Sequence, residues 1–162
     1  HCAVNSTNIF ILSDSTFKVY KFSLSNFQST TTDNATTSWG SGGTGPGQYT
    51  GYGSIIADEN YIYISSRDGS GITKFDTSGN IIKHIGTPKI RQICFNSDNN
   101  SEIFGTDYNT GKFTIFNKEL TILKTVGYSG GDSGLSSDSS GYVYISGYQN
   151  DYQISKYQLK RN

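Results

Sequence analysis

Several residue types are scarce in this chain of 162 residues. It contains no Met, 1 Trp, 2 Pro and 2 Cys, and charged residues make up 16% of it, against ~25% in an average globular domain. Its 13 basic and 13 acidic residues cancel, so the chain lacks the broad positive field that drives binding to nucleic-acid phosphates. Its longest apolar runs, such as Ile9 to Leu12, have four residues, far fewer than the ~20 that a membrane-spanning helix needs.

The residue types that are abundant indicate β-structure. The chain holds 19 Gly, 12 Tyr and 9 Phe, and this aromatic content is too high for a disordered chain. No stretch keeps apolar residues at the i, i+3, i+4 and i+7 spacing of a helix, whereas short alternating runs bounded by Gly, Asn, Asp and Ser recur. This pattern predicts an all-β chain with tight turns. The length permits one domain with a sizeable core, or part of a larger one.

Four segments of the chain share one plan, in which a short strand of apolar and aromatic residues ends near a hydroxyl residue. They are Asn8 to Ser13, Asn60 to Ser65, Ser101 to Thr106 and Gly141 to Ser146. Their anchor positions, Ile11, Tyr63, Phe104 and Tyr144, are separated by 52, 41 and 40 residues. The chain is therefore an internal repeat.

Each repeat holds further strands around its anchor. Another alternating strand follows the anchor strand, such as Ile72 to Phe75, and the last strand of the repeat comes after a short turn, such as Ile81 to Ile85. A strand also precedes the anchor and leads into a turn that holds Asp58, Asp98 or Asp138. Four strands in a repeat of ~40 residues are typical of a β-propeller blade. Because one blade cannot bury both of its faces, neighbouring blades cover them.

We therefore predict an all-β fold, a β-propeller built of four-stranded antiparallel blades, with four blades present. The chain forms one propeller unit, in which the repeats cover approximately residues 1–38, 52–88, 89–127 and 131–162. Residues 39–51 form a Gly-rich connector between the first two blades.

The connector and the second repeat carry the most specific pattern. It runs from Trp39-Gly40 through Gly47-Gln48-Tyr49, Ser54-Ile55-Ile56-Ala57-Asp58 and Tyr61-Ile62-Tyr63-Ile64 to Lys74-Phe75-Asp76 and Gly79-Asn80. This order resembles the NHL repeat family of β-propellers, whose pattern has a Trp-Gly, a Gly-Gln-aromatic loop, an apolar strand ending in Asp, a Val-Tyr-Val strand and a Lys-Phe-Asp…Gly-Asn hairpin. The resemblance covers essentially the whole chain and is weakest in the first repeat. The Pro that usually precedes the inner strand is missing from the second repeat.

The resemblance implies a ring of about six blades, of which four repeats form only a part. The fourth repeat ends with Ile154 to Leu159 as its third strand, and no outer strand follows. Three explanations stay open: a segment of a longer polypeptide, a ring completed by another chain, and a divergent four-bladed propeller. We expect self-association or a missing remainder before the small ring, because open blade edges and faces invite association. The absence of Met at residue 1 fits a processed chain or an excised segment.

Possible sites outside the strands are few. Asn5, Asn34 and Asn99 begin glycosylation sequons, which predicts glycans on an exposed, secreted protein. Candidate residues for contact with a partner or a sugar at the blade rim are Asp14, Arg67, Asp107, Tyr148 and Tyr152. The two loop tyrosines offer an apolar face with one polar tip.

The remaining motifs give no catalytic, cofactor or metal site. Gly131-Asp132-Ser133-Gly134 matches the surroundings of serine protease nucleophiles, but a nucleophile needs a positioned base, and the repeat places these residues in a blade connector. The three turn aspartates occur one per blade without the clustering that calcium requires, and we interpret them as caps of their own turns. Cys2 and Cys94 fall near the same point of the inner strand in blades that are not neighbours, which favours two small apolar residues over a disulfide.

We expect a non-enzymatic structural or binding module outside the cell, a segment or subunit of a larger assembly. Its partners are then a protein or further copies of the chain that complete the ring, or a glycan, and neither nucleic acid nor a membrane span is expected. The alternative is a propeller enzyme, because some NHL-like propellers are lyases or lactone hydrolases with a metal at the ring centre. Such an enzyme needs converging His, Asp, Glu or Asn side chains, and this chain has only 2 His.

Overall fold

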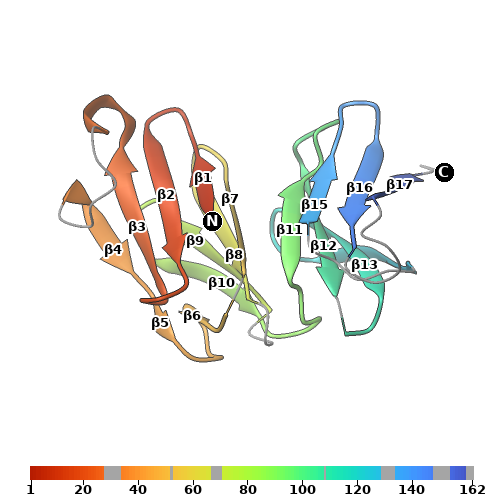
Figure 1. Ribbon diagram of the computed structural model, residues 1–162, viewed down its shortest axis with the longest axis horizontal. Helices are drawn as coiled ribbons and strands as arrows, with labels where there is room; N and C mark the ends of the chain where they lie inside the picture. Colours follow the sequence, from red (N-terminus) through yellow and green to blue (C-terminus); the bar gives the residue numbers. More distant parts are fainter. Residues whose placement is uncertain are drawn as a thin grey trace. The chain divides into compact units, whose positions relative to one another are not determined.

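The computed structural model describes residues 1–27, 34–51, 53–66, 71–107, 109–128, 134–147 and 154–159 (Figure 1). In these residues the regular structure is β-strand, apart from short 3₁₀ segments, of which η1 (Leu24–Asn26) is the longest described. The predicted all-β class is therefore confirmed. The chain divides into two compact units, residues 1–89 and 90–162, and each is described by itself. Across the described residues, no helix has the length and apolar character that crossing a membrane requires.

Unit 1 contains two four-stranded antiparallel sheets, which we call blades 1 and 2. Blade 1 consists of β1 (Cys2–Val4), β2 (Asn8–Ser13), β3 (Lys18–Ser23) and β4 (Thr37–Trp39) in that order. Blade 2 consists of β7 (Ser54–Ala57), β8 (Tyr61–Ser65), β9 (Ile72–Asp76) and β10 (Ile81–Ile85). The connector between them holds a short parallel pair, β5 (Ser41–Gly42) and β6 (Gln48–Tyr49). Trp39 thus ends the fourth strand of blade 1, just before the Gly-rich run.

Unit 2 contains blades 3 and 4, built on the same meander. Blade 3 consists of β11 (Gln92–Phe95), β12 (Glu102–Asp107), β13 (Lys112–Asn117) and β14 (Ile122–Gly127). Within the described part of the chain, blade 4 has three strands, β15 (Gly134–Ser137), β16 (Tyr142–Ser146) and β17 (Ile154–Gln158). In Figure 1 this order is seen in blade 1, where β1 to β4 lie side by side.

The strand registers correct the alignment of the first repeat by one residue. Tyr63 pairs with Lys74 in blade 2, and Phe10 pairs with Lys21 in blade 1. Both Tyr63 and Phe10 lie third in their strands, after turns of equal length. Phe10, rather than the predicted anchor Ile11, is therefore the counterpart of Tyr63. The repeat was aligned one residue off at this strand because the apolar run of β2 has no polar–apolar alternation that would distinguish its two faces.

Acidic and amide side chains close the turn before the second strand of a blade. Asp58 and Asp138 each accept two backbone N–H groups of their turn at 2.8 to 3.0 Å, which confirms their interpretation as turn caps. In blade 3 the turn is longer, and Asn96 takes this position instead of the predicted Asp98. Asp98 donates its N–H to Asn96 Oδ1 at 3.1 Å.

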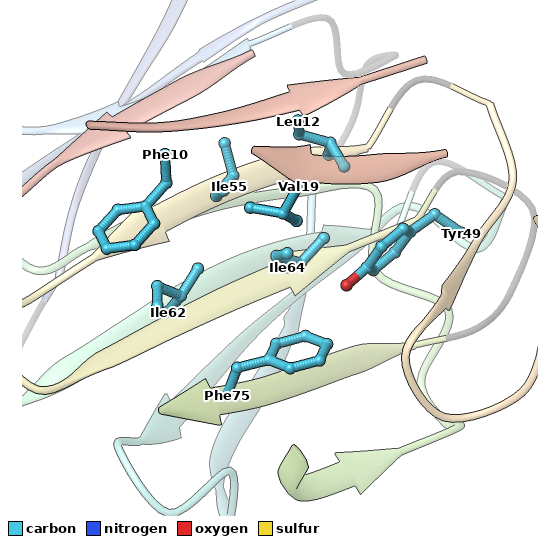
Figure 2. Close-up of a cluster of buried hydrophobic side chains, with 8 residues drawn as sticks. All are labelled: Phe10, Leu12, Val19, Tyr49, Ile55, Ile62, Ile64 and Phe75. Atoms are coloured by element: carbon cyan, nitrogen blue, oxygen red, sulfur yellow. The ribbon is translucent and has the colours of Figure 1, made fainter. Parts of the chain in front are cut away.

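The core of unit 1 lies between its two blades. Phe10, Leu12 and Val19 of blade 1 point toward side chains of blade 2 (Figure 2). The members from blade 2 and the connector are Tyr49, Ile55, Ile62, Ile64 and Phe75, and Ala3, Trp39 and Ala57 pack at the margin. All eight central residues are at most 5% exposed. Apolar burial of this kind provides most of the stabilisation of stacked blades.

The core of unit 2 repeats this arrangement. Phe104 and Phe113 of blade 3 are packed together with Val143 and Ile145 of blade 4. The rings of the two phenylalanines lie 5.4 Å apart, centre to centre. The partly buried neighbours are Cys94, Ile115, Tyr128, Leu135, Tyr157 and Leu159. Each unit is therefore a pair of blades held together by apolar faces.

Candidate binding site

A groove of about 640 Å³ opens in unit 2, beside the core between blades 3 and 4. Most of its lining comes from the last two strands of each blade. The apolar and aromatic part consists of Phe113, Ile115, Leu123, Val126, Tyr128, Val143, Ile145, Tyr157 and Leu159. Glu102, Lys124, Gly127 and Gln158 complete it. A mostly apolar groove with a few polar groups is the usual form of a binding site.

The equivalent region of unit 1 is filled by the chain itself. Phe75 is the counterpart of Tyr157, because the two residues pair with the second residue of β8 and β16 respectively. The rings of Trp39 and Tyr49 lie 6.2 and 6.4 Å from that of Phe75. Ile81, in the fourth strand, pairs with Phe75 on its other side. Blade 4 has no fourth strand among the described residues, and Tyr157 lines the groove instead.

The groove runs along a strand edge. In the described residues β17 has one neighbour, β16, so its far side is the edge of the sheet. Edge strands are templates for pairing with another extended segment. Across the groove, β14 presents Leu123 and Val126 with 52% and 37% of their surfaces exposed. Strand edge and apolar lining together suit an extended peptide, which pairs by its backbone and inserts alternate side chains.

The predicted rim residues fall partly outside the described residues, as Arg67, Tyr148 and Tyr152 do. Asp14 is half-buried in the turn after β2 of unit 1. Asp107 of unit 2 is 4% exposed and belongs to its own hairpin: Oδ1 accepts the N–H of Asn109 at 2.9 Å, and Oδ2 accepts the hydroxyl of Thr110 at 2.7 Å. Its oxygens are therefore already used in stabilising that turn.

The three sequon asparagines have different surroundings. Asn34 and Asn99 are exposed. Asn5 is 8% exposed, and its Nδ2 donates to the carbonyl oxygens of Asp58 and Glu59 at 3.4 Å each. Since a glycan is attached at Nδ2, a glycan on Asn5 requires this contact between blades 1 and 2 to open. Glycosylation therefore stays a prediction, with Asn34 and Asn99 as its accessible sites.

Residues with catalytic or metal-binding chemistry are dispersed. The described ranges contain no group of three or more His, Cys, Asp or Glu that could hold a metal ion. The first three residues of the Gly131 to Gly134 motif lie outside the described residues. His84 is half-buried on β10, where its Nδ1 lies 2.9 Å from Thr73 Oγ1, and burial lowers its pKa. Cys2 and Cys94 are both free thiols.

Comparison with known proteins gives similarity at the level of the fold. No protein-family model matches the chain, and no curated protein sequence matches it. Solved β-propeller structures do match. The chain has the β-propeller fold. The WD40 β-propeller domain of Doa1 matches 96% of the chain with a TM-score of 0.67 and 12% identity, over 48% of its own length.

Two further matches are proteins of different kinds, a natural one and a designed one. A putative 6-phosphogluconolactonase from Bacteroides uniformis matches 98% of the chain with a TM-score of 0.75 and 17% identity, over 52% of its own length. The computationally designed protein Ika4 matches 98% of the chain with a TM-score of 0.69 and 8% identity, over 89% of its length. The chain thus spans about half the length of these two natural proteins and most of the designed one. At these identities the matches show the fold alone.

The groove residues were missed by sequence reasoning, although one signal for them was present. The third strand Ile154 to Leu159 without an outer strand was recognised from the sequence. The groove lies beside that strand, which is β17 in the structure. Residues such as Val126 and Tyr157 resemble ordinary core positions in the sequence, and only the arrangement of the two blades leaves them accessible.

Proposed function

We propose that this chain is a non-enzymatic binding and structural module, an NHL-type β-propeller unit that takes up an extended peptide strand in the groove of unit 2. One observation carries the proposal: Tyr157 lines an open apolar groove beside the edge strand β17, whereas its counterpart Phe75 in unit 1 is covered by Trp39 and Tyr49 and pairs with the fourth strand β10. A strand bound there continues the sheet of blade 4 and covers Tyr157. Its alternate side chains contact the exposed apolar residues of β14.

The setting that we propose is outside the cell, as part of a larger assembly. The low charge and the two accessible sequons, Asn34 and Asn99, support it. The NHL assignment rests on the residue pattern around Trp39 and the second repeat. Glycan analysis of the protein from its native source tests the setting; a native chain without glycan at both positions counts against it.

The groove is tested with a peptide that the chain itself specifies. Residues 80–86 contain the fourth strand of blade 2, so a fluorescently labelled peptide of that sequence is the probe, and a scrambled peptide is its control. We expect a Kd on the order of 100 µM by fluorescence anisotropy, which is weak because a free peptide loses conformational freedom on binding. Slower hydrogen exchange of the β17 amides in the complex is expected in addition.

A matched pair of variants locates the binding. Val126→Asp places a charge in the groove and should weaken binding at least about tenfold, because a desolvated carboxylate is unfavourable there. Ile82→Asp makes the same kind of change at a residue that is 50% exposed on β10, in the other unit, and should leave binding unchanged. Equal binding of the native and scrambled peptides, or equal loss in both variants, contradicts the proposed site.

A further inference from the structure

The blades of both units stack by one rule. In unit 1 the face of blade 1 that holds Ala3 and Phe10 packs on the face of blade 2 that holds Ile55 and Ile62. We call these the forward face and the back face. In unit 2 the forward face of blade 3, with Phe104, packs on the back face of blade 4. Forward-to-back stacking is therefore repeated within the chain.

A lysine lies over tyrosine rings on two of the forward faces. Lys74 of blade 2 has its Nζ 3.9 Å from the centre of the Tyr61 ring and 5.8 Å from that of Tyr63. Lys156 of blade 4 repeats this geometry, at 3.8 Å from Tyr142 and 5.5 Å from Tyr144. The registers match as well, since Tyr63 pairs with Lys74 and Tyr144 pairs with Lys156. Such cation–π contacts gain strength when water is removed.

The two forward faces differ in their exposure. In blade 2, Lys74 and Tyr63 are 1% and 0% exposed. In blade 4, Lys156 is exposed and the adjacent Ile154 is 72% exposed. The same lysine–tyrosine arrangement is thus compatible with complete burial in one blade and lies open to solvent in the other.

The chain also carries an accessible back face. Cys2 pairs with Ile11 in blade 1 as Ile55 pairs with Ile64 in blade 2, so Cys2 occupies on blade 1 the back-face position of Ile55. Cys2 is exposed, and Val4 on the same face is 52% exposed. One chain therefore exposes the two kinds of surface that stack on each other, a forward face on blade 4 and a back face on blade 1.

We infer that the forward face of blade 4 binds the back face of blade 1 of a second copy of this chain. The inference rests on the proposed function as an assembly module and names the surface that it uses. Lys156, Tyr142 and Tyr144 then become buried as Lys74 and Tyr63 are in blade 2, and Ile154 contacts the apolar back face. Because the contact joins two different surfaces, it repeats from copy to copy until a ring closes.

The mass in solution tests the association. By light scattering and sedimentation, the protein should increase from one copy to two or more as its concentration rises toward about 1 mM, a range set by weak Kd values. Ile154→Asp should raise the midpoint concentration at least tenfold, whereas the Ile82→Asp control should leave it unchanged. A single copy at every concentration, or equal effects of the two variants, overturns the inference.

A cysteine pair tests the register of the contact. Ser136 pairs with Tyr144 as Ala3 pairs with Phe10, so Ser136 has the forward-face position of Ala3, which packs against the cluster that contains Ile55. In the Ser136→Cys variant, oxidised glutathione should therefore join the introduced thiol to Cys2 of a second copy. The two thiols lose two protons and two electrons, and each glutathione disulfide consumed yields two glutathione molecules.

The expected product is a covalent pair of chains on a non-reducing gel, with the peptide that links Cys2 to the introduced thiol identified by mass spectrometry. The Cys2→Ser, Ser136→Cys double variant should give no such product. A disulfide between these positions within one chain, or cross-linking as efficient from Ile82→Cys, overturns the inference. Peptide binding in the groove is measured with the labelled peptide, and neither Ile154 nor Cys2 lines the groove, so binding can persist when cross-linking fails and the two proposals are tested separately.

Discussion

The ring of Trp39, at the end of β4, lies 6.2 Å from the ring of Phe75 on β9, centre to centre. Trp39 also meets Phe10 at 6.3 Å in an edge-on arrangement. The indole thus joins the last strand of blade 1 to the third strand of blade 2. It covers the region that is open as a groove in unit 2.

Replacing this ring should loosen unit 1. We expect Trp39→Ala to reduce the free energy of unfolding by about 3 kcal/mol, the low end for a large aromatic because the side chain is only partly buried. Trp39→Phe should reduce it by about 1 kcal/mol, because contact with Phe75 is retained in part. Urea titration followed by far-ultraviolet circular dichroism is the measurement, since Trp39 is the single tryptophan of the chain. Equal stability of the alanine variant contradicts this role.

Gly79 should not tolerate a side chain next to this indole. Its φ is +89°, and a Cβ there would lie 2.6 to 2.8 Å from atoms of the Trp39 ring. We expect Gly79→Ala to lower the unfolding free energy by about 2 kcal/mol, from backbone strain and the close contact together.

A double-mutant cycle separates the two causes. In the Trp39→Ala background the contact is removed, and the effect of Gly79→Ala should fall to about 1 kcal/mol of backbone strain. Gly86→Ala is the control, because the nearest atom to its Cβ, His84 Nε2, is 3.8 Å away; a change within about 0.5 kcal/mol is expected. An identical effect of Gly79→Ala in both backgrounds rules out the contact with Trp39.

The sequence predicted most of the fold because local patterns specify it. Alternating strands such as Tyr61 to Ser65, with turn residues such as Asp58, have physical signatures that need no knowledge of the tertiary structure. The slip in the first repeat has an equally local cause, since the apolar run of β2 does not distinguish its two faces. The groove around Tyr157 and the burial of Asn5 were not predictable in this way, because both depend on what a neighbouring blade covers.

The stability of unit 1 should depend on the charge of His84. Burial lowers the pKa of His84 from its usual 6.5, so the folded protein favours the neutral ring. The contribution of this group is therefore present above pH 6.5 and is lost as the pH falls through that value toward the folded pKa. The melting temperature should decrease between pH 7.5 and 5 (about the range in which histidine titrates), and less so in His84→Gln. Since His1 stays in both proteins, parallel curves would contradict a contribution from His84.

The two thiols should differ in reactivity. Burial raises the pKa of Cys94 from 9.0 to about 12, although a hydrogen bond with Ser137 opposes the shift, and the side chain packs at the margin of the unit 2 core. Because the thiolate is the reactive form, a disulfide reagent at about pH 8 should modify exposed Cys2 rapidly and Cys94 only after denaturant is added. Counting the released chromophore in the native protein, in Cys2→Ser and in Cys94→Ala assigns each phase.

The same pKa determines how stability changes at alkaline pH. The folded pKa of Cys94 lies above the unfolded value, so its contribution is complete below about pH 8.5 and declines as the pH rises toward 12. Burial also raises the pKa of Tyr49, whose effect begins only above its usual 10.0. Between about pH 8.5 and 10, the melting temperature of the native protein should therefore fall, while that of Cys94→Ala should fall less. Rapid modification of Cys94 without denaturant, together with identical alkaline curves for the two proteins, contradicts the burial of this thiol.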